Sequence, residues 1–221
     1  METEIKIAMV DDHTLLRSAL AKLINGFGDC QVILEAGDGQ QLIRKLSAGP
    51  VPDVVLLDLN MPVMDGFDTA SWLKQHHPNV HVLMLTMYDS ELTLIRLLQA
   101  GVKGFLKKDV EPAELKFALH AVMQSGYYYS TQTAGRLVNL FRSNNKDNLR
   151  LQHATLAENE IRFLKLACSD MTYKEIAQEM NLSPRSVDGL RDHLFMRLEV
   201  RSRVGLAMVA IRNGIINLTS Q

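Results

Sequence analysis

The chain has 221 residues, a net charge of −1 and an ordinary balance of 47% hydrophobic and 22% charged residues, which is typical of globular domains. No apolar run approaches the roughly 20 residues of a membrane helix, and the acidic N-terminus is unlike a secretory signal, so we expect a cytoplasmic protein. Cys30 and Cys168 are far apart in strand and helix patterns, which favours two buried thiols over a disulfide or a metal site.

The first 125 residues alternate short apolar runs with longer amphipathic ones. Buried strands are predicted at residues 5–10, 31–36, 54–58, 80–86 and 104–107. Apolar spacing of three and four predicts helices at residues 14–26, 40–48, 66–76, 91–100 and 111–125. Gly26, Gly49 and Gly101 follow three of these helices and are predicted to end them in the left-handed conformation. These βα units predict an α/β fold, a five-stranded doubly wound parallel sheet with helices on both faces.

The pattern changes after Gly126. A modest helical stretch at 133–141 precedes the polar segment 143–148, which is predicted to be a flexible linker. The remaining residues show no strand pattern, and helices are expected at about 157–169, 173–180, 184–198 and 202–213. We therefore expect three parts: a first domain at 1–125, a helical and flexible linker at 126–150, and an all-α four-helix domain at 151–221.

Helix start signals and charge support this division. Capping boxes are predicted at Thr155–Glu158 and Thr172–Glu175, and Ser183 is predicted to cap a helix beginning at Pro184. Residues 1–125 carry a net charge of −5, whereas residues 126–221 carry +4. This asymmetry permits contact with nucleic acid without predicting it.

Polar residues stand at the carboxyl ends of the predicted strands, the edge at which open parallel sheets bind ligands. They are Asp11, Asp12, Asp58, Thr86 and Lys108. Three converging carboxylates repel one another, and Mg²⁺ relieves that repulsion while keeping waters for a phosphate ligand. A hydroxyl and an ammonium facing them supply what phosphoryl transfer needs. Each residue alone is also compatible with a turn or a solvated charge, but their recurrence along the sheet favours a site.

The motifs around these residues, at 10–13, 56–66, 85–86 and 104–108, resemble those of two-component receiver domains. The resemblance implies that Asp58 accepts a phosphoryl group from a phosphohistidine of a sensor histidine kinase. It implies that Asp12 and Asp58 bind Mg²⁺ directly, that Asp11 does so through water, and that the carbonyl of Asn60 completes the site.

The same resemblance assigns the other residues of the site. Thr86 and Lys108 would hold the phosphoryl group, and Phe105 would turn inward as Thr86 moves. Because neighbours on a strand face opposite sides, Lys107 is expected to be a solvated charge on the strand edge. Four histidines lack metal-ligand spacing and are expected to be surface or capping residues: His13, His76, His77 and His81.

Residues 172–198 form two helices joined by Met180–Pro184, which is the sequence form of a helix-turn-helix. Nearly all of 153–217 matches the LuxR-type pattern, so the whole chain is similar to a NarL/FixJ-type response regulator. The residues expected to contact double-stranded DNA are Lys174, Ser183, Arg185, Ser186, Asp188, Gly189, Arg191 and Asp192.

The recognition helix departs from the common pattern. Asp188 stands where a lysine is usual, Leu190 where a histidine or aromatic is usual, and Gly189 lowers helix stability by ~1 kcal/mol. The modest charge predicts weak binding by a monomer, for which a homodimer on two half-sites would compensate. The apolar stripe at 205–211 is either that dimer surface or part of the domain's own core.

We therefore expect a phosphorylation-controlled transcription regulator with no membrane partner, and not an enzyme beyond its own phosphorylation and dephosphorylation. One alternative is a Mg²⁺-dependent phosphohydrolase with Asp58 as nucleophile, although nothing in residues 126–221 indicates a substrate pocket. Another is a module whose helix-turn-helix binds protein, which Asp188 and Asp192 would permit. A salt-dependent interaction with random duplex separates DNA binding from protein binding.

Overall fold

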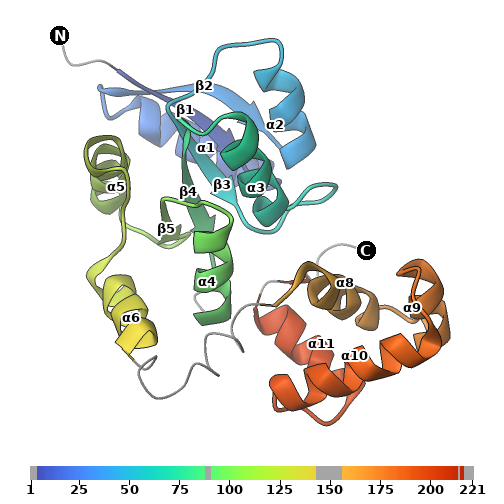
Figure 1. Ribbon diagram of the computed structural model, residues 1–221. Coiled ribbons are helices and arrows are strands. Elements are labelled where there is room, and N and C mark those ends of the chain that lie inside the picture. Colours follow the sequence, from blue (N-terminus) through green and yellow to red (C-terminus); the bar gives the residue numbers. More distant parts are fainter. Residues whose placement is uncertain (1–3, 88–90, 143–155, 214, 217–221) are drawn as a thin grey trace. The chain divides into compact units, whose positions relative to one another are not determined.

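The computed structural model describes residues 4–87, 91–142, 156–213 and 215–216 (Figure 1). It divides into two compact units. Among the described residues, no helix is long and apolar enough to cross a membrane. The polar segment 143–148, predicted to be a flexible linker, lies outside the described residues.

The N-terminal unit is built on a five-stranded sheet in which every neighbouring pair is parallel, in the order β2-β1-β3-β4-β5. The strands are β1 (Ile5–Val10), β2 (Cys30–Ala36), β3 (Val54–Asp58), β4 (His81–Thr86) and β5 (Gly104–Lys107). The strand order reverses between β1 and β3, and the carboxyl ends of those strands are where such sheets bind ligands. The predicted five-stranded parallel sheet is confirmed.

Helices cover both faces of this sheet (Figure 1). They are α1 (Thr14–Asn25), α2 (Gly39–Leu46), α3 (Gly66–His76), α4 (Glu91–Gln99) and α5 (Pro112–Ser125). Ile7 and Met9 of β1 share one core cluster with Ile24 of α1 and Leu119 of α5. Ala8 and Val10 alternate with them and are buried on the opposite face, so both faces of β1 are covered.

The ends of the helices differ in part from the prediction. Gly101 takes the left-handed conformation, with φ +88°. Gly26 does not, because its amide hydrogen-bonds back to the carbonyls of Lys22 and Leu23 at φ −75°, and the left-handed turn falls at Gly28 (φ +81°). Gly49 is likewise not among the glycines with positive φ, so this prediction was wrong at two of three positions.

The segment after α5 runs along the free edge of β5 before α6 (Thr131–Arg142) begins. Tyr128 bridges Gly104, and its amide donates to the carbonyl of Lys103 at 2.9 Å. A Cβ on Gly104 would lie 2.2 Å from the carbonyl oxygen of Tyr128, so only glycine permits this approach. The hydroxyl of Tyr128 donates to Glu114 of α5 at 2.8 Å, which holds the segment in place.

The C-terminal unit contains the four predicted helices, α8 (Glu158–Ala167), α9 (Tyr173–Glu179), α10 (Pro184–Arg197) and α11 (Arg203–Arg212). They surround one apolar cluster that includes Phe163, Ile176, Leu194 and Leu206, all fully buried. The prediction of an all-α domain after the α/β unit is confirmed.

The caps of these helices follow the sequence with one exception. Glu175 accepts from the amide of Thr172 at 2.6 Å, and the hydroxyl of Ser183 accepts from the amide of Ser186 at 3.1 Å, as predicted. The capping box predicted at Thr155–Glu158 was wrong, because α8 begins at Glu158 itself. The carboxylate that reaches back is that of Glu160, which accepts from the amide of Ala157 at 2.7 Å, and Thr155 lies outside the described residues.

Candidate functional site

Three carboxylates meet at the carboxyl ends of β1 and β3. Asp11 and Asp12 directly follow β1, and Asp58 is the last residue of β3. Ligand atoms of these residues and of His13 all lie within 4.8 Å of one another. Asp11 and Asp58 are buried, whereas the side chain of Asp12 is 32% exposed and lies at the mouth of the site. The parallel register therefore assembles the acidic cluster that the sequence predicted.

Lys108 supplies the positive charge of the site. Its Nζ lies 2.9 Å from Oδ2 of Asp11 and 2.9 Å from Oδ2 of Asp58. Its amide donates to the carbonyl of Thr86 at 3.2 Å, which joins the ends of β4 and β5. The side chain of Lys107, one residue earlier on β5, is exposed. The structure thus turns Lys108, and not Lys107, toward the carboxylates.

The electrostatics of the site make Asp58 unusual. Burial raises the pKa of Asp58 to about 6, although Lys108 pulls it down, and the neighbouring Asp11 adds to the rise. Burial alone would lower the pKa of Lys108, but Asp58 and Asp11 reverse this and raise it. A single ammonium thus leaves the carboxylates short of positive charge.

The loop after β3 holds the backbone of Asp58 in place. Oδ1 of Asp58 accepts from the amide of Leu59 at 2.8 Å, and the amide of Gly66 donates to the carbonyl of Leu59 at 2.9 Å. A Cβ on Gly66 would lie 2.3 Å from the carbonyl oxygen of Asp58, so this closure requires glycine. Asn60 lies half-buried in the same loop, and its role as a metal ligand stays a prediction.

A tight turn at the tip of this loop carries backbone strain. The amide of Met64 donates to the carbonyl of Pro62 at 2.7 Å, which leaves Val63 at φ +67°. A β-branched residue rarely adopts this conformation, and its side chain is 75% exposed. The turn therefore presents Val63 to solvent in the loop that follows Asp58.

His13 belongs to the site, which the sequence reasoning missed. It precedes α1 as the N-cap residue, and its Nδ1 lies 3.0 Å from Oδ1 of Asp11 and 2.9 Å from Oδ1 of Asp12. Its amide donates to Asp11 at 2.7 Å. Metal-ligand spacing in the sequence cannot reveal this position, because His13 pairs with its immediate neighbours.

Thr86 and Phe105 lie on the strands beside the acidic cluster. Thr86 is buried at the end of β4, one residue past Leu85, which pairs with Asp58 across the sheet. Phe105 of β5 is buried, and its ring meets that of Tyr129 edge-on at a centroid distance of 6.1 Å. Phe105 is thus packed inward in this structure, against the segment that leads to α6.

In the C-terminal unit, the residues predicted to contact DNA lie mostly on the surface. Those that are exposed are Lys174, Ser183, Arg185, Ser186, Asp188, Gly189 and Asp192. The hydroxyl of Ser183 is engaged in capping and lies 2.8 Å from that of Ser186. A Cβ on Gly189 would meet nothing within 4 Å, so packing does not require a glycine there.

Arg191 is held by its own helix instead of projecting freely. Its Nη1 lies 2.9 Å from Asp188 and its Nη2 lies 2.8 Å from Asp192, while its guanidinium lies 5.1 Å from the ring centroid of Tyr173. The side chain is 25% exposed. Asp188, Arg191 and Asp192 therefore form a charge clamp on the surface of the recognition helix.

Other charged residues of this unit support the fold. Glu160 is buried and accepts from Arg197 at 2.6 Å, which joins α8 to α10. Arg203 donates to the carbonyls of Ala167 at 2.8 Å and Ser169 at 2.6 Å, which caps the end of α8. These arginines are thus committed to structure.

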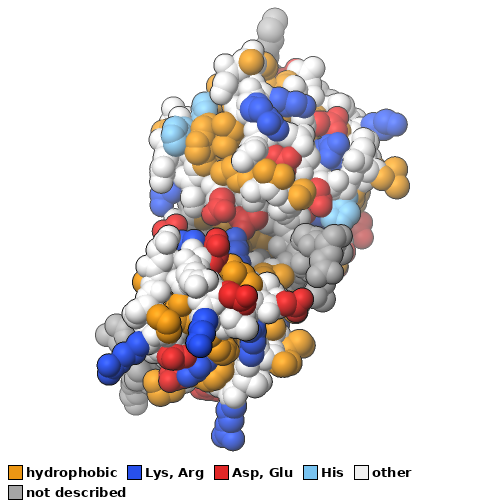
Figure 2. All heavy atoms as spheres, turned by 90° about the vertical axis from the view of Figure 1, so that its right-hand side faces the viewer, with side chains coloured by type: hydrophobic (Ala, Val, Ile, Leu, Met, Phe, Trp, Pro, Cys, Tyr) orange, Lys and Arg blue, Asp and Glu red, His pale blue; other side chains and the backbone are white. Residues whose placement is uncertain are grey.

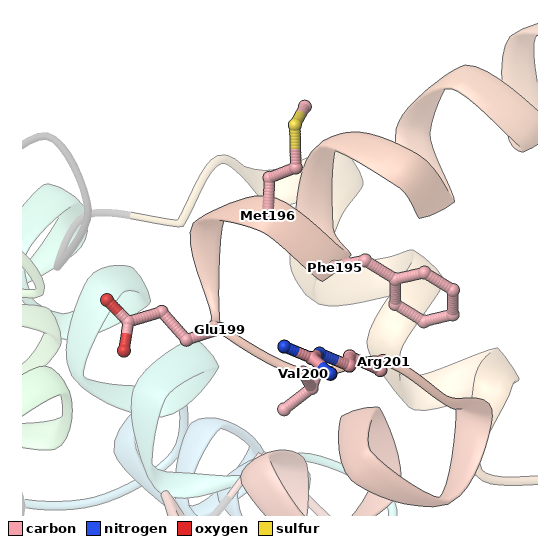
Figure 3. A pocket seen from close by; sticks show the side chains of 5 residues that line it. All are labelled: Phe195, Met196, Glu199, Val200 and Arg201. Atoms are coloured by element: carbon pink, nitrogen blue, oxygen red, sulfur yellow. The ribbon is translucent and has the colours of Figure 1, made fainter.

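The other end of α10 borders an open hollow lined by Phe195, Met196, Glu199, Val200 and Arg201 (Figure 3). It lies at the helix end away from the Ser183 cap, so it is separate from the surface predicted to meet DNA. On the face of the molecule shown in Figure 2, Lys and Arg side chains lie between Asp and Glu side chains instead of forming one block.

Comparison with known proteins agrees with this architecture. The response regulator receiver domain family matches residues 7–120, and the luxR family of bacterial regulatory proteins matches residues 154–210. Response regulator GacA of Pseudomonas aeruginosa is 30% identical over 217 residues, covering 98% of this chain and 100% of GacA. Oxygen regulatory protein NreC of Staphylococcus aureus is 30% identical over 216 residues, covering 96% and 99%.

Solved structures share the fold. Response regulator ChrA of a heme-sensing two-component system matches with a TM-score of 0.52 at 25% identity, covering 98% of this chain and 100% of ChrA. RcsB from Salmonella enterica serovar Typhimurium, bound to promoter rprA in the presence of phosphomimetic BeF₃⁻, matches with a TM-score of 0.68 at 22% identity, covering 93% and 98%.

An acidic cluster at the switch point of a parallel sheet, followed by a helix-turn-helix, is typical of a receiver domain joined to a nucleic-acid-binding domain. The chain belongs to the two-component response regulators of the NarL/FixJ type, in which a receiver domain precedes a LuxR-type DNA-binding domain. It is a two-component transcription regulator, and its receiver implies a histidine kinase as partner.

Proposed function

We propose that Asp58 is the phosphoacceptor of this regulator and that its phosphorylation controls DNA binding. The single observation that carries the proposal is the convergence of Asp11, Asp58 and Lys108, with Lys108 2.9 Å from both carboxylates. Phosphoryl transfer needs a nucleophilic oxygen with positive charge beside it, and this arrangement supplies both.

In the proposed reaction, Oδ of Asp58 attacks the phosphorus of a phosphohistidine, an acyl phosphate bond forms, and the phosphorus–nitrogen bond breaks. Lys108 offsets the negative charge on the transferred oxygens, and the hydroxyl of Thr86 donates a hydrogen bond to one of them. Before phosphorylation, Lys108 holds Asp58 in position through the 2.9 Å contact.

The donor set fits Mg²⁺, which binds oxygen ligands and retains waters for a phosphate. The fit rests on the convergence of Asp11, Asp12 and Asp58, whose ligand atoms lie within 4.8 Å of one another. Asp12 and Asp58 would hold the ion directly, Asp11 through water, and Asn60 through its carbonyl. When bound, the ion supplies charge neutralisation at the phosphoryl oxygens.

The output is proposed to be a change in dimerisation or DNA affinity. Because Arg191 pairs with Asp188 and Asp192, few cations of the recognition helix remain to contact DNA phosphates. Binding by one domain is then weak, and a homodimer that binds two half-sites would compensate. Leu206 and Ala210 of α11 pack in the core of their own domain, whereas Val204 and Met208 are 71% and 62% exposed. The stripe predicted at 205–211 therefore has a core side, and the exposed side remains available for a dimer.

We also propose that the protein has no enzymatic activity besides its own phosphorylation and dephosphorylation. A general phosphohydrolase with Asp58 as nucleophile would turn over phosphate esters many times. Release of less than one equivalent of product from p-nitrophenyl phosphate per chain supports the proposal, and sustained turnover would overturn it.

Intact-mass measurement tests phosphorylation directly. Acetyl phosphate with Mg²⁺ is expected to add one phosphoryl group per chain to the wild type and none to Asp58→Ala. Chelation of Mg²⁺ is expected to abolish the gain. An equal gain in Asp58→Ala would show that another residue is the acceptor.

A further inference from the structure

A second cluster of ligand-type side chains lies at the opposite edge of the sheet, near the amino ends of the strands. Asp29 and Cys30 stand where β2 begins, and His120 faces them from α5. One ligand atom from each of the three residues lies within 4.8 Å of the other two. Cys30 and His120 are 90 positions apart in the sequence, so only the fold brings them together.

The backbone fixes the position of this cluster. The amide of Ile5 donates to the carbonyl of Asp29 at 3.0 Å, and Cys30 pairs with Ile5 in the parallel register of β1 and β2. Cys30 is 2% exposed, whereas the side chains of Asp29 and His120 are 30% and 33% exposed. The cluster therefore has a buried thiol behind two groups that solvent reaches.

The donor atoms of the cluster are incompletely satisfied. Among the described residues, Oδ1 of Asp29 and Nε2 of His120 are buried atoms with no hydrogen-bond partner. Nε2 of His120 lies 3.1 Å from Oδ2 of Asp29, but the contact lacks hydrogen-bond geometry. Buried polar atoms without a partner are rare in folded proteins, and a bound ion is one explanation for them.

We propose that Asp29, Cys30 and His120 form a binding site for Zn²⁺. Thiolate, imidazole and carboxylate are the three ligand types that Zn²⁺ takes in proteins, and a fourth position remains for water. The thiol of Cys30 separates this site from the cluster at Asp58, which contains no cysteine and whose carboxylates suit Mg²⁺. The sequence alone indicated two ordinary thiols, because it does not reveal the approach of His120.

Binding replaces the proton of the thiol. The thiol of Cys30 is buried and carries its proton before a metal binds. As the sulfur–zinc bond forms, that proton passes to solvent. The negative charges of Cys30 and Asp29 then balance the charge of the ion.

The ammonium of Lys116 opposes the binding of a cation at this site, so its replacement provides a matched test. Its Nζ lies 3.1 Å from Oδ2 of Asp29 and donates to the carbonyl of Phe27 at 3.1 Å. Without a metal, Asp29, Lys116 and His120 would form only an ion-pair network between α5 and the start of β2. With a metal, the ammonium repels the cation, so Lys116→Met is expected to bind zinc more tightly.

The full chain is titrated with Co²⁺, a spectroscopic substitute for Zn²⁺, after the acidic site has been filled with excess Mg²⁺. We expect one equivalent to give a near-ultraviolet thiolate-to-cobalt band that Zn²⁺ removes. Cys168→Ser is expected to keep the band and Cys30→Ser to lose it. His120→Gln is expected to weaken Zn²⁺ binding by more than about tenfold.

Unfolding followed by the fluorescence of Trp72, the single tryptophan, verifies that each variant retains its fold. Absence of the band from the folded wild type would overturn the proposal, as would a band that survives in Cys30→Ser. Phosphorylation of Asp58 by acetyl phosphate is expected to continue in Cys30→Ser, so failure of the zinc site is distinguishable from failure of the phosphoacceptor.

Discussion

Burial of Asp58 disfavours the charged carboxylate that its proposed role as a nucleophile requires. Its folded pKa of about 6 lies above the ordinary value of 3.8, so the folded protein keeps a proton between pH 4 and 6 that the unfolded chain has lost. Stability from this group is therefore present at low pH and lost as pH rises through about 6. The cost at neutral pH makes the site receptive to a cation.

In buffer with chelator, Asp58→Asn is expected to be more stable than the wild type at pH 7 by about 1–3 kcal/mol, because the buried charge is gone. The advantage should shrink as pH falls from 6 to 4. Denaturant unfolding followed by Trp72 fluorescence measures it in the receiver domain. Asp109→Asn, at an exposed position, is the control, and an equal or larger gain there would contradict the account.

Gly66 sets the position of Asp58 through its missing side chain. Gly66→Ala is expected to lower the initial rate of phosphorylation by acetyl phosphate by about tenfold or more, because its Cβ would push the Asp58 carbonyl away. Intact mass against time measures the rate. Gly135→Ala, where a Cβ meets nothing within 4 Å, should phosphorylate like the wild type; equal rates in both variants would contradict this role.

The sequence predicts those site residues whose positions follow from the alternation of side chains along a strand and from the ends of the strands. The resemblance to the receiver motif selected Lys108 over Lys107, and strand alternation is consistent with that choice. His13 escaped prediction because its contacts depend on a side-chain rotamer. The Zn²⁺ cluster escaped because His120 comes from a helix whose rotation about its axis the sequence does not fix.

The recognition helix, α10, carries two acidic residues that pair with its own Arg191. The sequence indicated an odd helix, with Asp188 in place of the usual lysine, but not that Asp188 and Asp192 hold Arg191. Long side chains choose among many rotamers, so such a clamp is visible only in the structure. We expect the clamp to reduce non-specific attraction to phosphates and so to increase the relative weight of base contacts.

Asp188→Asn is expected to raise affinity for a random DNA duplex by about threefold to tenfold and to steepen its salt dependence, because Arg191 gains freedom to contact phosphate. Fluorescence anisotropy at several salt concentrations measures both effects. Asp170→Asn removes the same charge at an exposed position outside this helix. Equal effects of the two substitutions would show that net charge alone matters.

Helix boundaries were predicted to within a few residues, and the errors have local causes. Gly26 was expected to be left-handed, but the chain continues two residues further before it turns at Gly28. At α8, the sequence pattern selected Glu158, three residues after Thr155, but Glu160 makes the contact with the amide of Ala157. Alanine has no side-chain oxygen, so the capping-box pattern does not predict an N-cap at Ala157.

For the whole molecule, the proposed function requires that phosphorylation at Asp58 change the conformation of residues that lead to the DNA-binding domain. Thr86 and Lys108 are joined through the backbone, Phe105 lies three residues before Lys108 on β5, and its ring contacts Tyr129. Tyr129 belongs to the segment that leads to α6. A movement of Thr86 and Phe105 on phosphorylation would therefore act on this segment.

Tyr129→Leu is expected to accept phosphate at a normal rate but to reduce the effect of phosphorylation on DNA affinity by about threefold or more. Parallel measurements of intact mass and DNA binding separate the two effects. Met123→Leu, at an exposed position of α5, should respond like the wild type. A full response in Tyr129→Leu would exclude this route.

The central claim, that phosphorylation of Asp58 controls DNA binding, is tested most directly by selection from sheared genomic DNA of the source organism. Wild type and Asp58→Ala are compared with and without acetyl phosphate and Mg²⁺, and the affinity for the recovered fragments is measured. Phosphorylation is expected to change the affinity of the wild type by about fivefold or more and to leave that of Asp58→Ala unchanged. The same response in both proteins, or no response in a wild type shown to be phosphorylated, would contradict it.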